Sequence, residues 1–158
     1  MVMEPMTVNG AQKLRAELEK LIREERPRII EAIATARALG DLKENAEYHT
    51  AKDRQGMIEA RIRDLEGKLQ NAQIIDISTI PPVDRVLFGC TVTLKDMNTK
   101  KNSKYQIVGD DESDSASKKI SYSSPVAKAI MGKPLKQEVE VLLPDGDLRC
   151  RIEKIEHL

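Results

Sequence analysis

The chain has 158 residues, with 26 basic and 26 acidic side chains and a formal net charge of zero. This balance excludes a bulk electrostatic clamp on nucleic acid, because such a clamp needs a strongly basic face that releases counterions. Charged residues make up 33% of the chain, aromatic residues only 3%, and Trp is absent, so the composition favours a long solvated helical element over one thick core.

The first ten residues contain no apolar run that follows positive charge. No later stretch approaches the ~18 to 20 apolar residues that are needed to span a bilayer. We therefore expect a soluble, cytoplasmic protein that has no membrane partner.

Residues 11–39 have the apolar spacing of a helix, with hydrophobic side chains mostly three or four positions apart. This stripe comprises Leu14, Leu18, Leu21, Ile22, Ile29, Ile33 and Ala36. Pro27 interrupts the run, and a proline inside a helix removes one backbone hydrogen bond. The sequence predicts a bend between Arg23 and Pro27 rather than the end of the helix.

Residues 42–75 predict a second helix with a regular heptad seam. The seam comprises Ala51, Gln55, Ile58, Ile62, Leu65, Leu69 and Ala72. Neither helix can bury so narrow a stripe alone, and only a few residues around Gly40 separate them, so we expect an antiparallel coiled-coil hairpin. At 1.5 Å per residue, an arm of ~30 residues would be about 45 Å long. A hairpin that buries its own seam is expected to be a monomer.

The pattern changes after residue 76. Residues 77–84 contain two adjacent prolines and predict a stiff linker between a first domain of residues 1–76 and a second domain of residues 85–158. Five later segments have the length and alternation of strands, namely residues 85–94, 104–108, 119–123, 138–143 and 148–155.

A short helix over residues 125–131 is expected to interrupt these strands, because Pro125 suits the first turn of a helix. The predicted fold class is α+β, with the helical hairpin followed by a small, mostly antiparallel sheet that carries one short helix. Cys90 and Cys150 lie in apolar strand segments without a nearby Cys or His, so we expect buried thiols with no chemistry.

The hairpin tip, GDLKENAEYH at residues 40–49, allows two interpretations. In the structural one, Gly40 closes the first helix, Asp41 caps the second, and Glu44 completes a capping box. In the functional one, the two carboxylates share a hard cation such as Mg²⁺. Two ligands are too few for a tight site made by this protein alone, so a partner would have to complete the metal site.

The first half of the chain resembles the Gre family of bacterial transcript cleavage factors in three successive segments, RPRIIEAIATARALG, GDLKENAEYH and RIRDLEGKLQNAQIID. The second half is similar to that family's second domain in FGCTVTL, YQIVGDDESD, SYSSPVAKAIMGK and VEVLLPDGDLRCRIEKIEHL, in the same order. The resemblance covers essentially the whole chain. It implies that the second domain is FKBP-like.

The resemblance also implies a function. The factor would bind bacterial RNA polymerase, insert its hairpin into the secondary channel and stimulate hydrolysis of the nascent RNA 3′ end in backtracked complexes. Asp41 and Glu44 match the family's catalytic acids, and they would help to hold one Mg²⁺ of a two-metal site that is completed only within polymerase. No metal is therefore expected in the isolated protein, and the protein is not expected to be an enzyme on its own.

Three further sets of residues match positions with roles in the family. The tip-supporting residues are Lys43, Asn45 and Tyr48; the basic patch that guides the RNA 3′ end is Arg37 and Lys52; the segment that docks on the polymerase rim is Ser123, Ser124, Pro125 and Val126. Most of these have a structural explanation too: Asn45 can support the turn, Arg37 and Lys52 can be simply solvated, and Ser124 can cap a helix.

Two other functions remain open from the sequence. One is a factor that occupies the same polymerase channel and regulates transcription without promoting cleavage, although the presence of both acids argues against it. The other is a coiled-coil scaffold or chaperone whose charged tip grips a client protein, and its activity would not depend on the carboxylates.

Overall fold

The computed structural model describes residues 3–40 and 45–158. These residues form two compact units, a helical unit within residues 11–71 and a sheet unit of residues 3–10 and 72–158. No helix in the described ranges combines the length and the apolar character that a membrane crossing requires.

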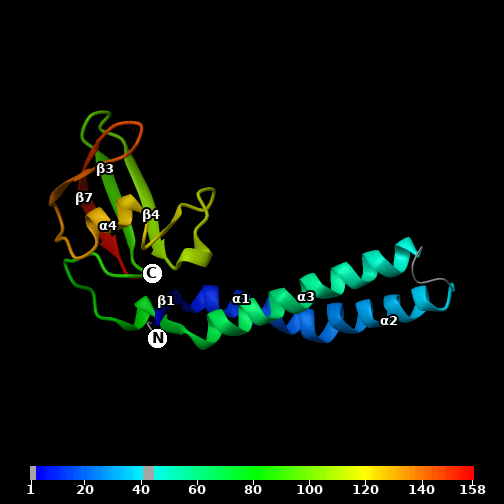
Figure 1. Cartoon of the computed structure of the whole chain (residues 1–158). Coiled ribbons are helices and arrows are strands. Elements are labelled where there is room, and N and C mark those ends of the chain that lie inside the picture. Colours follow the sequence, from blue (N-terminus) through cyan, green and yellow to red (C-terminus); the bar gives the residue numbers. More distant parts are fainter. Residues whose placement is uncertain (1–2, 41–44) are drawn as a thin grey trace. The chain divides into compact units, whose positions relative to one another are not determined.

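The helical unit is a hairpin of long helices, as predicted (Figure 1). Its first arm is continuous: α1 (Val8–Lys20), a π-helix η1 (Leu21–Glu25) and α2 (Arg26–Arg37) follow one another without a gap. The second arm is α3 (Ala46–Gln70). The predicted range of the second helix, residues 42–75, was too long, because α3 begins at Ala46 and residues Ala72–Ile75 form a strand.

The π-helix η1 overlaps the segment Arg23–Pro27, in which the sequence predicted a bend. The N–H of Arg26 donates to the carbonyl of Leu21, five residues earlier, instead of to the residue four earlier. Pro27 has no N–H to donate and clashes with the usual ladder, so a wider turn at this point lets the helix continue. The helix therefore continues past Pro27, as expected.

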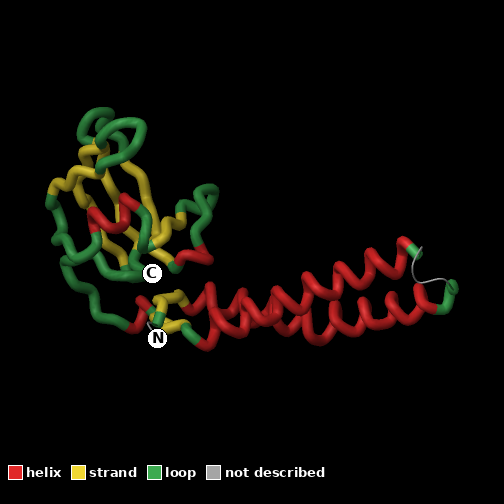
Figure 2. The backbone as a smooth tube through the Cα atoms, viewed as in Figure 1, coloured by secondary structure: helices red, strands yellow, loops and turns green. Residues whose placement is uncertain are grey.

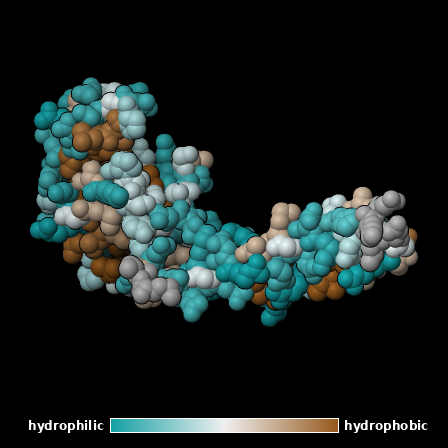
Figure 3. Space-filling model, viewed as in Figure 1, coloured by the Kyte–Doolittle hydropathy of each residue, from teal (hydrophilic) through white to brown (hydrophobic). Residues whose placement is uncertain are grey.

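The two arms bury the stripes that the sequence indicated. The buried core of the hairpin consists of Ile29, Ile33, Ala51, Ile58 and Ile62, with Leu18, Leu21 and Tyr48 packed against it. Ile22 was wrongly placed on the stripe: it is 38% exposed, because its neighbour Leu21 occupies the inward position. The face of the hairpin seen in Figure 3 is mostly hydrophilic with small apolar patches, which agrees with a narrow seam.

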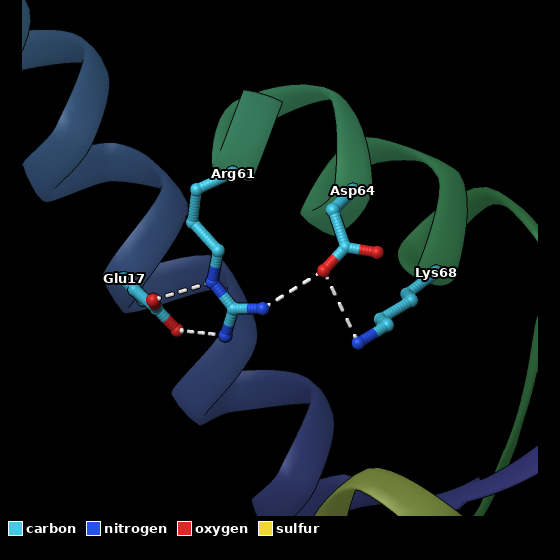
Figure 4. A network of polar contacts seen from close by, with 4 residues as sticks. All are labelled: Glu17, Arg61, Asp64 and Lys68. Atoms are coloured by element: carbon cyan, nitrogen blue, oxygen red, sulfur yellow. Dashed lines mark hydrogen bonds and ion pairs between the residues drawn. The ribbon is translucent and has the colours of Figure 1, made fainter. Parts of the chain in front are cut away.

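A network of four charged residues links α1 to α3 (Figure 4). Arg61 donates to both oxygens of Glu17, through Nε at 2.8 Å and Nη2 at 3.0 Å. Its third nitrogen donates to Asp64 at 2.8 Å, and Lys68 pairs with the same carboxylate at 3.2 Å. The hydrogen bond from Arg61 holds the pKa of Glu17 below its ordinary value, so the pair stays charged near neutral pH.

A second two-pronged pair joins the start of α2 to α3. Arg26 donates through Nε to Glu59 at 2.7 Å and through Nη2 at 2.9 Å. Glu59 and Arg61 lie two positions apart on α3, so the two pairs leave that helix in different directions. Exposed ion pairs contribute little stability each, but two-pronged geometry is specific, so these pairs fix the register of the arms.

The sheet unit contains two sheets (Figure 2). The smaller pairs β1 (Glu4–Thr7) in parallel with β2 (Ala72–Ile75). The larger has the order β5-β4-β3-β7-β6, and its strands are β3 (Thr91–Asp96), β4 (Asn102–Val108), β5 (Lys119–Ser121), β6 (Glu138–Val141) and β7 (Leu148–Glu156). Only β5 joins in parallel, so the sheet is mostly antiparallel, as predicted.

One core lies within this unit. The helix α4 (Pro125–Ile130) packs on it through Ala127 and Ile130, and Cys90 and Cys150 are both buried as free thiols, as expected. Burial raises the pKa of each thiol, which disfavours the reactive thiolate form.

Two segments before β3 differ from the expected secondary structure. The first predicted strand, residues 85–94, was placed too early, because the strand begins at Thr91. A short 3-10 helix η2 (Ile77–Thr79) precedes this region, and its Ile77 is buried in the core.

Candidate functional site

The candidate site is the tip of the hairpin, and its described part consists of the residues on both sides of the turn. α2 ends at Arg37, and Gly40 has φ of +112°, a conformation that residues with a side chain rarely adopt. On the other side α3 begins at Ala46, with Asn45 as its N-cap. Asp41, Lys43 and Glu44 lie outside the described residues, so the roles predicted for them stay predictions.

Asn45 joins the ends of the two arms. Its side-chain oxygen accepts the N–H of Tyr48 at 3.1 Å, which satisfies one of the free N–H groups at the start of α3. Its side-chain nitrogen donates to the carbonyl of Ala36 at 2.6 Å, near the end of α2. The structural explanation of Asn45 is therefore confirmed, and the cap of α3 is this residue rather than the predicted Asp41.

Replacing Asn45 by Ala is expected to destabilise the hairpin by about 2 kcal/mol, because the cap and the bond to Ala36 are lost together. Asn71→Ala is the matched control, since Asn71 ends the same helix through its backbone N–H to Gly67. Thermal unfolding followed by circular dichroism measures both variants. Equal unfolding temperatures for the two would contradict the bridging role of Asn45.

Arg37 and Tyr48 contact each other beside the turn. The guanidinium of Arg37 lies 5.7 Å from the centre of the Tyr48 ring, which is a cation–π distance. Tyr48 also packs against the hairpin core, and its ring meets that of His49 edge-on at 5.5 Å. Arg37 is thus exposed, with its guanidinium beside an aromatic ring.

Lys52 lies on the same face as Arg37. Both line a groove of about 220 Å³ between α2 and α3, together with Ile30, Ile33, Ala34 and Gln55. The Lys52 amine lies 3.4 Å from the side-chain oxygen of Gln55. The structure therefore brings the two predicted basic residues together over one groove.

The predicted docking segment lies in the sheet unit. Ser124 accepts the N–H of Ala127 at 3.3 Å and so caps α4, and Pro125 follows at its first position, which confirms the structural explanation of both. Val126 packs against the core, whereas Ser123 and Pro125 are exposed.

Asp110 organises this segment, although it was not among the predicted site residues. Its carboxylate accepts the hydroxyl hydrogens of Ser121 and of Ser123, the latter at 2.6 Å. These bonds, that from Ser121 first, hold the pKa of Asp110 below its ordinary value. Asp110 and Ser123 are separated by a loop and a strand, so no local spacing could have connected them. The acidic run at residues 110–112 was the one available signal.

No group of three or more His, Cys, Asp or Glu side chains within residues 3–40 and 45–158 is placed to hold a metal ion. The two acids expected to contact Mg²⁺ fall outside that part of the chain.

Two family models match successive parts of the chain and together cover most of it. Residues 4–74 match the N-terminal model described as transcription elongation factor, and residues 81–157 match the C-terminal model described as transcription elongation factor, GreA/GreB. The chain belongs to the GreA/GreB family of transcription elongation factors. The helical hairpin is thus the family's N-terminal part and the larger sheet its C-terminal part.

Individual relatives agree with this assignment. The chain is 53% identical over 154 residues to the transcription elongation factor GreA of Thioalkalivibrio sulfidiphilus, covering 98% of each chain. It is 51% identical to GreA of Pseudomonas aeruginosa over the same share of both chains. This is a GreA-like transcript cleavage factor.

Among solved structures, the transcription factor Gfh1 matches with 25% identity and a TM-score of 0.45, covering 98% of this chain and 99% of that one. The assignment to the family rests on the sequence matches.

Proposed function

We propose that this GreA-like factor binds bacterial RNA polymerase and inserts its hairpin into the secondary channel. There it stimulates cleavage of the nascent RNA 3′ end in backtracked complexes. The observation that carries the proposal is the match of both family models, which together span nearly the whole chain. Cleavage leaves a new 3′ end in the active site, so elongation can resume.

The length of the hairpin and the contacts between its arms suit a rod that carries the two tip carboxylates to a distant site. The 25 residues of α3 extend about 37 Å at 1.5 Å per residue. The two-pronged pairs Arg26–Glu59 and Arg61–Glu17 hold the arms in register along that length. Asn45 ties the arms together again beside the turn. These ion pairs and this hydrogen bond oppose sliding of one arm along the other. Such sliding would misplace the tip.

At the tip, Asp41 and Glu44 would supply carboxylate oxygens to a Mg²⁺ ion whose other ligands come from polymerase and RNA. A bound Mg²⁺ activates water and stabilises the charge that develops on the phosphate oxygens. The role of this chain is to present the two acids. The polymerase performs the hydrolysis, and the factor is an activator rather than an enzyme.

Arg37 and Lys52 would contact the extruded RNA. Both flank a groove whose floor includes Ile33, so a phosphate could meet the charges while a base or sugar covers apolar surface. Contact between Arg37 and Tyr48 restricts the guanidinium, which lowers the entropy lost on binding.

The exposed residues Ser123 and Pro125 would dock on the rim of the channel. The hydrogen bond that Ser123 donates to Asp110 holds the loop at Ser123 in one conformation, and the cap by Ser124 fixes the start of α4. A preordered loop loses little freedom when it binds.

Stalled elongation complexes test the proposal directly. Bacterial polymerase is halted and backtracked on a template with 5′-labelled RNA, and the chain is added with Mg²⁺. The expected result is faster shortening of the labelled RNA and renewed extension when nucleotides are supplied. Binding without faster shortening would favour a channel-occupying regulator, and absence of polymerase binding would favour a scaffold or chaperone.

A further inference from the structure

Thr7 stands at the junction of β1 and α1 and caps the helix. Its hydroxyl accepts the N–H of Gly10 at 3.1 Å, so Thr7 is the N-cap and Gly10 is the third residue of α1. Within the described residues, Thr7 is the only polar or charged residue that is buried, and it is 8% exposed. Its polar groups are shielded from water and need partners inside the protein.

The partner is Glu112, from a distant part of the chain. In an ordinary capping box, a Glu or Gln at the third helical position accepts the N–H of the cap. Here that position is Gly10, which has no side chain, and the carboxylate of Glu112 takes its place. Glu112 Oε2 accepts the N–H of Thr7 at 3.0 Å, and Oε1 accepts the Thr7 hydroxyl.

The same carboxylate caps a second helix. Glu112 Oε2 also accepts the N–H of Gly109 at 2.9 Å, at the start of the 3-10 helix η3 (Asp110–Glu112). All of these residues belong to the sheet unit. One side chain therefore fastens the first turn of α1 to η3.

Two glycines leave room for this arrangement. A Cβ at Gly10 would collide with the Glu112 carboxylate and lie 2.7 Å from its Cγ. A Cβ at Gly109 would lie 2.8 Å from the carbonyl oxygen of Pro5 and 2.9 Å from Glu112 Oε2. Glycine inside a helix costs stability relative to alanine, so Gly10 is explained by the space that Glu112 occupies.

We propose that Glu112 is a positioning residue for the cleavage activity, because it fixes the point at which the hairpin's first helix begins. The inference rests on the proposed function. Without the carboxylate, the N–H of Thr7 loses its partner and the first turn of α1 frays. α1 continues from Gly10 into the helical unit, so a frayed first turn weakens the helix that forms the hairpin's first arm. A hairpin with a weakened first arm spends less time with its tip in reactive geometry.

The first test compares Glu112→Ala, Glu112→Gln and the exposed control Glu138→Ala in stalled polymerase complexes at 25 °C. Glu112→Ala is expected to lower the cleavage rate at saturating factor by about tenfold, since positioning is lost and not binding. The factor concentration that gives half-maximal cleavage should change less than about twofold. Glu112→Gln should recover most of the rate, because its amide can still accept both N–H groups and donate to the Thr7 hydroxyl. Equal rates for Glu112→Ala and Glu138→Ala would overturn the proposal.

The second test uses Gly10→Ala in two backgrounds and does not depend on cleavage. In the original chain the added methyl displaces the Glu112 carboxylate, so the unfolding temperature should fall by about 4 °C. In the Glu112→Ala background the space is free and alanine is the better helix former, so the same change should raise the unfolding temperature. If Gly10→Ala shifted the unfolding temperature in the same direction in both backgrounds, the capping of α1 by Glu112 would be refuted.

The two tests separate the inference from the proposed function. If the original chain does not stimulate cleavage, the proposed function fails, and the role of Glu112 in it fails as well. If the original chain stimulates cleavage and Glu112→Ala stimulates it at the same rate, only the inference fails.

Discussion

Exchanging Asp41 for Asn together with Glu44 for Gln is expected to lower RNA cleavage in backtracked complexes on the order of 100-fold, equivalent to about 2.7 kcal/mol of transition-state stabilisation. Both changes keep the size of the side chain and its ability to accept a hydrogen bond. They remove the negative charge that makes a carboxylate a stronger ligand for Mg²⁺ than a neutral amide. Folding and polymerase binding are expected to change little, and a competition assay on polymerase measures the binding.

The matched control is Glu47→Gln, which removes one carboxylate from the exposed first turn of α3. It lies close to the tip acids in sequence and makes the same chemical change as Glu44→Gln. It should leave the cleavage rate within about twofold, because it supplies no ligand in the proposed site. Full cleavage by the Asp41 and Glu44 double variant would refute delivery of a metal by the tip.

The hairpin could be predicted because the pattern that specifies it, the spacing of apolar residues along each helix, is local and repeats along the chain. Ala51, Ile58 and Ile62 recur at heptad spacing, and that spacing places them on one side of a helix whatever else the chain does. All three are buried. The interruption at Pro27 was equally local, because a missing N–H affects the turn that contains it.

The pairing of β1 with β2 could not be predicted in the same way. Each strand has four residues, Pro5 lies inside the first, and the whole hairpin separates them in sequence. Proline discourages a strand assignment, and so short a strand carries little alternation to read. Only the fold brings the two segments together.

The tip shows where local signals compete. Asp41 and Asn45 are both good N-caps, and the sequence around Asp41 also matches a capping box, so the helix was predicted to start early. Asn45 caps α3 and also bonds to Ala36 across the turn. That second bond exists only once the arms have paired, and a sequence pattern does not contain it.

Glu112 is a similar case. The first helix was predicted over residues 11–39, so Gly10 lay outside it and called for no explanation. In the structure α1 begins at Val8, and the glycine at position 10 leaves room for the carboxylate that approaches from η3. The contact joins segments that are far apart in the chain, so a local sequence pattern does not contain it.

Ile62→Ala is expected to destabilise the hairpin by about 3 kcal/mol, because deletion of buried carbons leaves a cavity in a core too thin to collapse around it. Ile62 is 1% exposed, and within residues 3–40 and 45–158 four other residues form the buried cluster around it. For a unit of about 60 residues, such a loss lowers the unfolding temperature by about 15 °C. Circular dichroism at the helical band measures the temperature, and hydrogen exchange of residues 58–65 locates the loss.

Ile30→Ala is the matched control, since the same substitution is made on the opposite arm at a residue that is 52% exposed. Both variants gain the same helix propensity from alanine, so the difference between them isolates burial. Ile30→Ala should change stability by less than about 0.5 kcal/mol. If both variants unfolded at the same temperature, the seam would not be what holds the arms together. The ion pairs at Arg26 and Arg61 would then have to carry the rigidity on which delivery of the tip acids depends.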